Sequence, residues 1–94
     1  MTLQHARDEI SKLDCDIISL IAKRTKLAEE VIKEKRMEDR EINDELQSQI
    51  VLNRATENAI EAGLDVGEIK KIFEILIRIN IEKQKELMGG GNLP

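Results

Sequence analysis

The chain is poor in residues that interrupt helices. Its only proline is Pro94, the last residue, and none of its five glycines precedes Gly63. Because proline and glycine are the strongest breakers of a helix, almost nothing in the first two thirds of the chain would end one. Aromatic side chains are nearly absent as well, since Phe73 is the only Phe, Tyr or Trp. We therefore predict an all-α fold whose core is built from Ile, Leu, Val and Ala.

The length and the charge exclude several classes of protein. A chain of 94 residues can bury one core, which excludes a two-domain enzyme. The formal net charge is −4, and Lys and Arg alternate with Asp and Glu, so the chain offers no basic patch to a nucleic-acid backbone. No apolar run approaches the roughly 18 residues needed to span a bilayer. We expect neither nucleic acid nor a membrane as a partner.

Cysteine and histidine each occur once. Cys15 cannot form an intramolecular disulfide, and the N-terminus lacks a cationic and apolar leader, which together indicate a cytoplasmic protein. His5 has no second ligand with which to hold a metal ion, and Cys15 has no positioned histidine to activate it. We predict no metal site, no cofactor and no covalent catalysis.

What the chain does have is a long apolar row with helical spacing. From Leu3 onward, apolar residues recur at alternating steps of three and four. The row comprises Leu3, Ala6, Ile10, Leu13, Ile17 and Leu20 and continues with Leu27 and Val31. We predict a helix over residues 3–37, about 50 Å long, whereas a compact domain of this size has a radius of gyration of about 13 Å. Because the other residues cannot cover this protruding helix, we predict an intertwined homodimer.

The second predicted helix follows a charged stretch without periodicity. Residues 36–41 are expected to form a loop, and Asn43 or Asp44 is expected to cap the helix that begins next. The apolar face of this helix consists of Leu46, Ile50, Val51, Ala55, Ala59 and Ile60. It should end at Gly63, because glycine readily adopts the left-handed conformation that follows a helix.

The third predicted helix opens at Asp65. Glu68 follows three residues later, which is the spacing of a capping box, and the helix should run to about residue 87. Its apolar face consists of Ile69, Ile72, Phe73, Leu76 and Ile77. A three-helix domain over residues 1–88 is thus expected, with a flexible glycine-rich tail at 89–94.

Polar residues interrupt two of these apolar faces. Arg24 occupies a position of the first row where an unpaired charge is costly. Lys35 lies eleven residues later and therefore within about 20° of the same direction, with Ala28 between the two cations. Asn80 and Gln84 share a face of the third helix with Phe73 and Ile77. Arg24 and Lys35 on one helix could thus hold a small dianion opposite the amides of Asn80 and Gln84 on another.

Each of these residues taken alone also has a purely structural interpretation. An arginine in a long apolar row suits a buried ion pair or a device that fixes helix register. Lys35 and Arg7 suit a solvated helix face, and Asn80 and Gln84 suit a polar core contact or a frayed helix end. Because cations interrupt the apolar face of one helix and amides interrupt that of another, the two together favour a binding site.

The order of these residues resembles the all-helical chorismate mutases, in particular the free-standing, monofunctional type. The resemblance covers residues 3–88. It is carried by Arg7 before an Ile-Ser-x-Leu-Asp run, Ile17 to Arg24, Leu27-Ala28, Lys35, Ile42-Asn43-Asp44, Gly63-Leu64-Asp65, and Ile72-Phe73-x-x-Leu76-Ile77-x-x-Asn80-x-x-x-Gln84. The resemblance implies a dimer of three-helix subunits with two active sites, each completed by an arginine from the first helix of the other subunit.

The resemblance also implies roles for single residues. Arg7, reaching across the dimer, and Arg24 would bind the two carboxylates of chorismate, with Asn80 beside the ring carboxylate. Lys35 and Gln84 would flank the ether oxygen of the bond that breaks. Rearrangement of chorismate to prephenate is a unimolecular pericyclic step, so it needs no nucleophile, metal or redox cofactor.

Two positions depart from the family pattern. Asp44 would hold the ring hydroxyl, but Ser48 stands where the family usually has a glutamate that shares this task. Gln47 stands where the family often has an arginine. Two alternatives therefore stay open: an isochorismate-pyruvate lyase, which would use a comparable cationic pocket, and a non-catalytic helical dimer that serves as a regulatory module.

Overall fold

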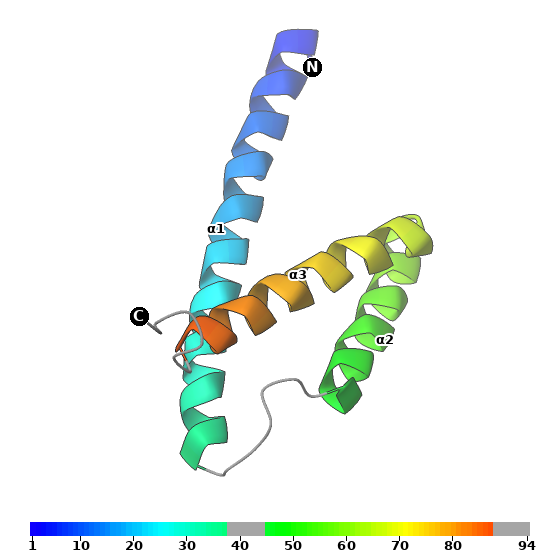
Figure 1. The fold of residues 1–94 in the computed structure, drawn as a ribbon. Helices are drawn as coiled ribbons and strands as arrows, with labels where there is room; N and C mark the ends of the chain where they lie inside the picture. Colours follow the sequence, from blue (N-terminus) through cyan, green and yellow to red (C-terminus); the bar gives the residue numbers. More distant parts are fainter. Residues whose placement is uncertain (38–44, 88–94) are drawn as a thin grey trace.

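The computed structural model describes residues 1–37 and 45–87, and these form three helices. α1 spans Leu3–Met37, α2 spans Glu45–Ala62 and α3 spans Val66–Leu87. The predicted all-α fold with one very long first helix is confirmed. The N-terminal half of α1 projects beyond the other two helices (Figure 1). The chain measures 53 × 30 × 20 Å and has a radius of gyration of 16.6 Å, compared with about 13 Å for a compact domain of this size.

The turn between α2 and α3 follows the local signals of the sequence. Gly63 has a φ of 71°, which is the left-handed region. The Leu64 amide donates to the Ala59 carbonyl at 2.9 Å, and the Gly63 amide donates to the Ile60 carbonyl at 3.1 Å. This pair of bonds is the Schellman motif, which satisfies carbonyls that a helix end would leave unpaired. The predicted end of the second helix at Gly63 is confirmed.

One half of the predicted capping box forms at the start of α3. Asp65 Oδ2 accepts a hydrogen bond of 2.9 Å from the Glu68 amide, so Asp65 caps the helix as predicted. The Glu68 carboxylate pairs with Lys71 Nζ at 3.0 Å instead of returning to the Asp65 backbone. An i,i+3 partner of opposite charge therefore replaces the reciprocal bond of the box.

Three predictions concern the loop after the first helix, the cap of the second helix and the C-terminal tail. α1 includes residues 36 and 37, so it takes up the first part of the loop predicted at 36–41. The rest of that loop and the cap at Asn43 or Asp44 lie outside the described residues. The tail predicted at 89–94 lies outside them as well.

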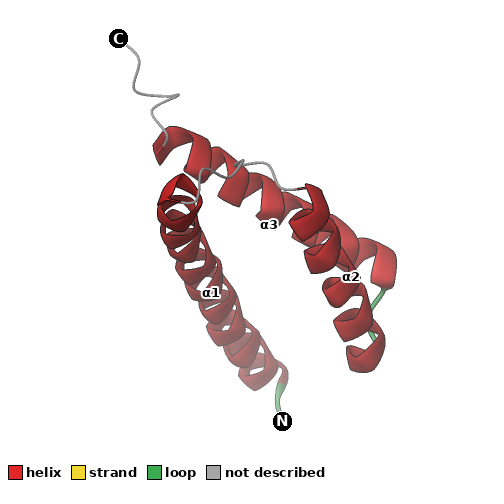
Figure 2. Cartoon of the chain, turned by 90° about the horizontal axis from the view of Figure 1, so that it is seen from below, coloured by secondary structure: helices red, strands yellow, loops and turns green. Residues whose placement is uncertain are grey.

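α3 is the helix that connects the other two. It packs against both α1 and α2, which lie on either side of it (Figure 2). The buried apolar residues are Ala28, Ile32, Ala55 and Ala59. Three of these four are alanines, whose small side chains let neighbouring helices approach closely. A single subunit therefore has a small core, and no large side chain that the structure describes is completely buried.

The side of α1 that faces α3 differs from the predicted row. Leu27 and Val31 were expected to continue that row, but they are 63% and 45% exposed, whereas Ala28 and Ile32 are 5% and 2% exposed. Each buried residue follows an exposed apolar one, so the two stripes are separated by about 100° around the helix. One stripe of α1 packs on its own subunit, and the other remains uncovered.

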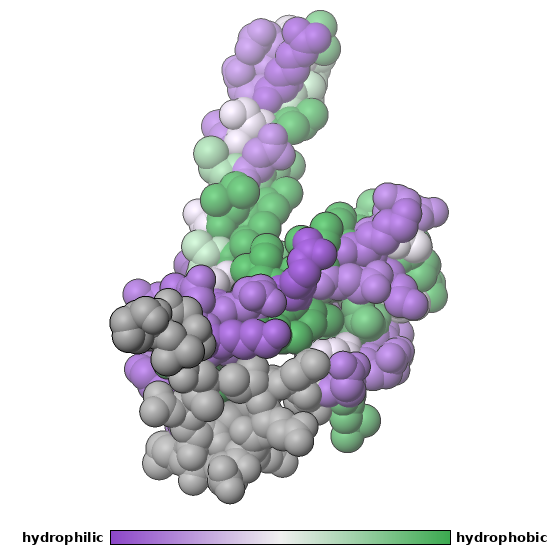
Figure 3. Space-filling view, in the orientation of Figure 1, coloured by the Kyte–Doolittle hydropathy of each residue, from purple (hydrophilic) through white to green (hydrophobic). Residues whose placement is uncertain are grey.

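Large apolar side chains are exposed over much of the surface. On the projecting part of α1 they are Leu3, Ile10, Leu13, Ile17, Ile18 and Leu20. Figure 3 shows hydrophobic surface along the middle of α1 and in the angle between α1 and α3. A continuous exposed apolar surface is typical of a protein interface. Within the described residues, none of the helices is both long enough and apolar enough to cross a membrane.

Candidate functional site

The candidate site begins where α1 and α3 meet. Gln84 is the buried polar residue of the described chain, with 6% of its surface exposed. Its Nε2 donates to the backbone carbonyl of Ala28 at 3.4 Å. A carbonyl oxygen can only accept, so this contact turns the nitrogen of the amide toward α1. The second hydrogen on Nε2 is left to donate to another acceptor.

Arg24 lies one turn before Ala28 on α1 and points toward α3. Its guanidinium carbon lies over the ring of Phe73, 5.9 Å from the ring centroid. Its Nη1 is buried and has no hydrogen-bond partner among the described residues. Burial of the side chain lowers the pKa of Arg24, because desolvation disfavours the charged form. A buried cationic donor without a partner is costly, and an anionic ligand would satisfy it.

The face of α3 toward Arg24 carries no charge. Phe73, Ile77, Asn80 and Gln84 follow one another at steps of four, three and four, so they share one side of the helix. Phe73, Ile77 and Asn80 are half-buried, and Gln84 is buried. These four residues of α3 are uncharged, and the amides of Asn80 and Gln84 can both donate and accept hydrogen bonds. This combination suits a ligand that carries carboxylates and other oxygens.

The remaining predicted site residues are not joined to this group by the described contacts. Within the described residues, no hydrogen bond, ion pair or ring contact links Arg7, Ser48 or Asn80 to Arg24 or Gln84. Arg7 is exposed on the projecting part of α1. It precedes Arg24 by seventeen residues on one helix, so their backbones are about 26 Å apart. One subunit cannot bring both arginines to one small ligand.

Residues of the predicted site also lie near the ends of α1 and α2. In the first turn of α2, Gln47 is exposed and Ser48 is half-buried. Lys35 belongs to the last turns of α1, eleven residues and about 16 Å along the axis from Arg24. The Lys35 side chain and Asp44 lie outside the part of the chain that the structure describes.

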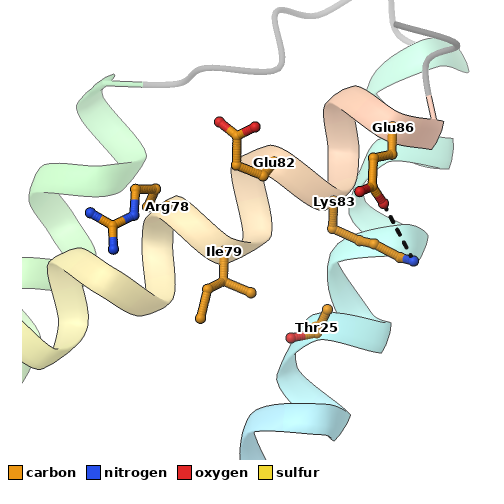
Figure 4. Close-up of a pocket in the computed structure, with 6 residues that line it drawn as sticks. All are labelled: Thr25, Arg78, Ile79, Glu82, Lys83 and Glu86. Atoms are coloured by element: carbon orange, nitrogen blue, oxygen red, sulfur yellow. Dashed lines mark ion pairs between the residues drawn. The ribbon is translucent and has the colours of Figure 1, made fainter. Parts of the chain in front are cut away.

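A shallow pocket of about 300 Å³ lies on another face of α3 (Figure 4). It is lined by Thr25, Arg78, Ile79, Glu82, Lys83 and Glu86. Lys83 Nζ pairs with Glu86 Oε2 at 3.7 Å, and the Thr25 hydroxyl donates to the Ile21 carbonyl at 2.9 Å. Its cations and carboxylates balance, and no predicted site residue lines it. We therefore place the candidate site on the Arg24 side of α3.

Two contacts of this site were missing from the sequence analysis. A residue pattern does not predict that the Ala28 carbonyl is the partner of Gln84, because every residue carries the same backbone carbonyl. The ring of Phe73 was assigned to the apolar face of the third helix and not to Arg24. The sequence did contain a signal for the contact between Phe73 and Arg24, because the single aromatic residue lies on the same side of α3 as Asn80 and Gln84. The described residues contain no cluster of three His, Cys, Asp or Glu side chains placed to hold a metal ion.

Comparison with known proteins identifies the family to which the chain belongs. The family model described as chorismate mutase type II matches residues 6–85. The chain is also similar to the bifunctional chorismate mutase/prephenate dehydratase of Buchnera aphidicola subsp. Schizaphis graminum (strain Sg). The two are 29% identical over 82 residues, which make up 87% of this chain. The chain spans about a fifth of the length of that relative, 21%.

Proposed function

Because this chain belongs to the chorismate mutase type II family, we propose that it catalyses the rearrangement of chorismate to prephenate. The observation that carries this proposal is the buried Nη1 of Arg24, which lacks a partner beside a face of α3 that bears amides and no charge. Chorismate is a dianion of two carboxylates joined by an ether-linked framework. A desolvated guanidinium binds a carboxylate through a pair of parallel hydrogen bonds.

The site must meet two requirements for this reaction. It must hold a flexible substrate in its compact reactive conformer, which lowers the entropic part of the barrier. It must also place donors at the ether oxygen, where negative charge grows as the C–O bond breaks. Gln84 supports the second task, because the Ala28 carbonyl fixes its Nε2 and leaves one N–H available. Lys35 would supply a compact point charge from the last turns of α1.

A second copy of the chain would complete the site. Arg7 is too far along α1 to share a ligand with Arg24 of its own subunit. It lies between Leu3 and Ile10 at steps of four and three, and therefore on the exposed apolar side of the projecting helix. When that side packs into the angle between α1 and α3 of another subunit, Arg7 is carried toward the Arg24 there. An intertwined homodimer thus forms two identical sites.

The ring hydroxyl of the substrate would be bound at the start of α2. Asp44 would accept its hydrogen bond, and Ser48, half-buried in the first turn of α2, would be a second partner. Gln47 can donate a hydrogen bond where the family often has an arginine. Relative to the family pattern, one positive and one negative charge are absent together, so the net charge of the site is unchanged. The cytoplasmic location expected from the sequence stays a prediction.

A turnover assay tests the function directly. Purified protein is incubated with chorismate, its absorbance loss is followed, and prephenate is measured as phenylpyruvate after acid treatment. We expect chorismate loss matched by phenylpyruvate formation. A parallel assay with isochorismate, in which salicylate and pyruvate are measured, covers the lyase alternative. Turnover of isochorismate alone would contradict the mutase assignment, and turnover of neither substrate would identify the chain as a non-catalytic module.

The proposed dimer predicts that thermal stability depends on protein concentration. Because the apolar side of α1 has no adequate cover within one subunit, folding and association should be coupled. We expect the thermal unfolding midpoint to rise as protein concentration is raised, measured by circular dichroism between about 1 and 100 µM. A midpoint independent of concentration, together with a folded monomer in sedimentation at micromolar concentration, would contradict the dimer.

The contact between Gln84 and Ala28 predicts that the activity of a Gln84→Glu variant depends on pH. In Gln84→Glu the introduced carboxyl faces the Ala28 carbonyl and the proposed position of the ether oxygen, both of which need a donor. Only the protonated carboxyl can donate, and the ionised one repels the growing charge. We expect the ratio of variant to parent kcat to increase as the pH falls below the pKa of that carboxyl. A flat ratio across pH, with an unchanged circular dichroism spectrum, would show that Gln84 does not face the ether oxygen.

A further inference from the structure

Phe73 is the residue that meets the guanidinium of Arg24. We propose that Phe73 is a positioning residue, whose ring holds Arg24 in the orientation that receives a carboxylate of the substrate. The inference rests on the proposed function for the identity of the substrate. It adds a residue that touches neither substrate nor reacting atoms and acts through Arg24.

The placement of the two helices makes this contact possible. α1 and α3 meet where Gln84 contacts Ala28, and from there they diverge (Figure 1). Arg24 lies one turn back along α1, and Phe73 lies eleven residues back along α3, about 16 Å from Gln84 along the axis. The Arg24 side chain therefore spans the angle between the helices and ends over the Phe73 ring, 5.9 Å from the centroid.

A ring is a suitable support for an arginine that must bind an anion. The N–H groups of a guanidinium lie in its plane, and these are the donors that a carboxylate engages in pairs. An acidic side chain in place of Phe73 would occupy those donors and neutralise the charge. An aromatic face attracts the cation without accepting its hydrogen bonds in this way. The Nη1 donors consequently have no hydrogen-bond partner among the described residues.

The surroundings of Phe73 support the same interpretation. The neighbouring residues on this face of α3 are Ile77, Asn80 and Gln84, none of which carries a charge. Phe73 is thus the only described group that makes a specific attractive contact with the guanidinium. Without the ring, the long Arg24 side chain would gain rotamer freedom, and this freedom would have to be lost again when substrate binds.

Three variants test the role in catalysis. Phe73→Leu keeps an apolar side chain but removes the aromatic face, Phe73→Tyr keeps the face, and Leu76→Val is a control that removes apolar volume elsewhere on half-buried α3 surface. For Phe73→Leu we expect kcat/KM for chorismate to fall about 3- to 30-fold, the range that cation–π contacts cover. KM should account for most of this change. Phe73→Tyr and Leu76→Val should stay within about twofold of the parent.

The double variant separates positioning from simple packing. If Phe73 acts through Arg24, Phe73→Leu should cause no further loss of kcat/KM in an Arg24→Gln background. An equal loss in both backgrounds, or an equal loss in Phe73→Tyr and Phe73→Leu, would overturn the proposal. Equal kcat/KM for Phe73→Leu and Leu76→Val would overturn it as well.

A spectroscopic measurement tests the contact independently of activity. The chain has no Tyr or Trp, one Phe and one His, so an upfield ring-current shift of the Arg24 δ protons in NMR that is lost in Phe73→Leu identifies the Phe73 ring. We expect this shift in the parent and in Phe73→Tyr and its loss in Phe73→Leu. Absence of the shift in the parent would overturn the proposal even if chorismate is turned over. A parent that shows the shift but neither turns over chorismate nor binds a bicyclic dicarboxylate inhibitor would instead contradict the proposed function.

Discussion

Replacing Gln84 or Lys35 with alanine is expected to lower kcat about 10²- to 10³-fold, the effect of losing one preorganised donor to a developing oxyanion. The ether oxygen gains negative charge only as the bond breaks, so these residues should stabilise the transition state more than the bound substrate. KM should change less than kcat for both variants. The measurement is steady-state kinetics of chorismate loss.

Controls for this prediction come from the same helix and from Arg7. Lys85→Ala removes an exposed side chain adjacent to Gln84 and should leave kcat unchanged. Arg7→Ala should lower activity and raise KM appreciably as well, because a carboxylate is charged in both the ground state and the transition state. A kcat for Gln84→Ala within threefold of the parent, with an intact helical spectrum, would rule out Gln84 as a donor to the ether oxygen.

Mixing two inactive variants is expected to restore activity. Arg7→Ala and Arg24→Ala should each be nearly inactive alone. When the two are unfolded together and refolded, a mixed dimer contains one site with both arginines and one site with neither. Random pairing puts half of the chains into mixed dimers, so recovery should approach about a quarter of the parent activity.

The mixing experiment needs a check that mixed dimers form. Different affinity tags on the two variants allow the mixed dimer to be purified, and its activity per dimer should approach about half that of the parent. Each variant refolded alone serves as the control. No activity in the purified mixed dimer would show that Arg7 and Arg24 do not meet across an interface.

The parts of the fold that follow from neighbouring residues were predictable from the sequence. The helical apolar spacing from Leu3 and the absence of proline and glycine predicted the length of α1. Gly63 and Asp65 marked the turn between α2 and α3, because a left-handed residue and a side-chain cap each act within one helical turn. Such signals depend on a few consecutive residues, so they can be read without knowing the tertiary structure.

The contacts that assemble the site depend on how two distant helices cross. Gln84 and Ala28 are 56 residues apart, and no local pattern specifies that they meet. The sequence placed Arg24 and Gln84 on faces of complementary chemistry but left open which atoms would touch. It also did not reveal that the apolar ring of Phe73, and not a polar group, contacts the guanidinium.

The sequence also did not predict which of the two apolar stripes of α1 packs within the subunit. Ala28 and Ile32 pack within the subunit, and Leu27 and Val31 are exposed, yet all four fit an amphipathic helix. If α1 packs on its own subunit with one side and, as we propose, on a second copy with another, its apolar surface is too broad for one row. The periodicity identified the helix but could not assign each stripe to its partner.

The most direct test of the account is a crystal structure of the protein with a bicyclic dicarboxylate that mimics the transition state. The central claim is that one site is built from Arg24 and Gln84 of one subunit and Arg7 of another. We predict that Arg24 contacts one carboxylate of the ligand, that Gln84 Nε2 contacts its ether oxygen while still donating to Ala28, and that Arg7 of the second subunit contacts the other carboxylate. A ligand bound away from the α1–α3 angle, or one whose carboxylates both contact residues of a single subunit, would contradict the claim.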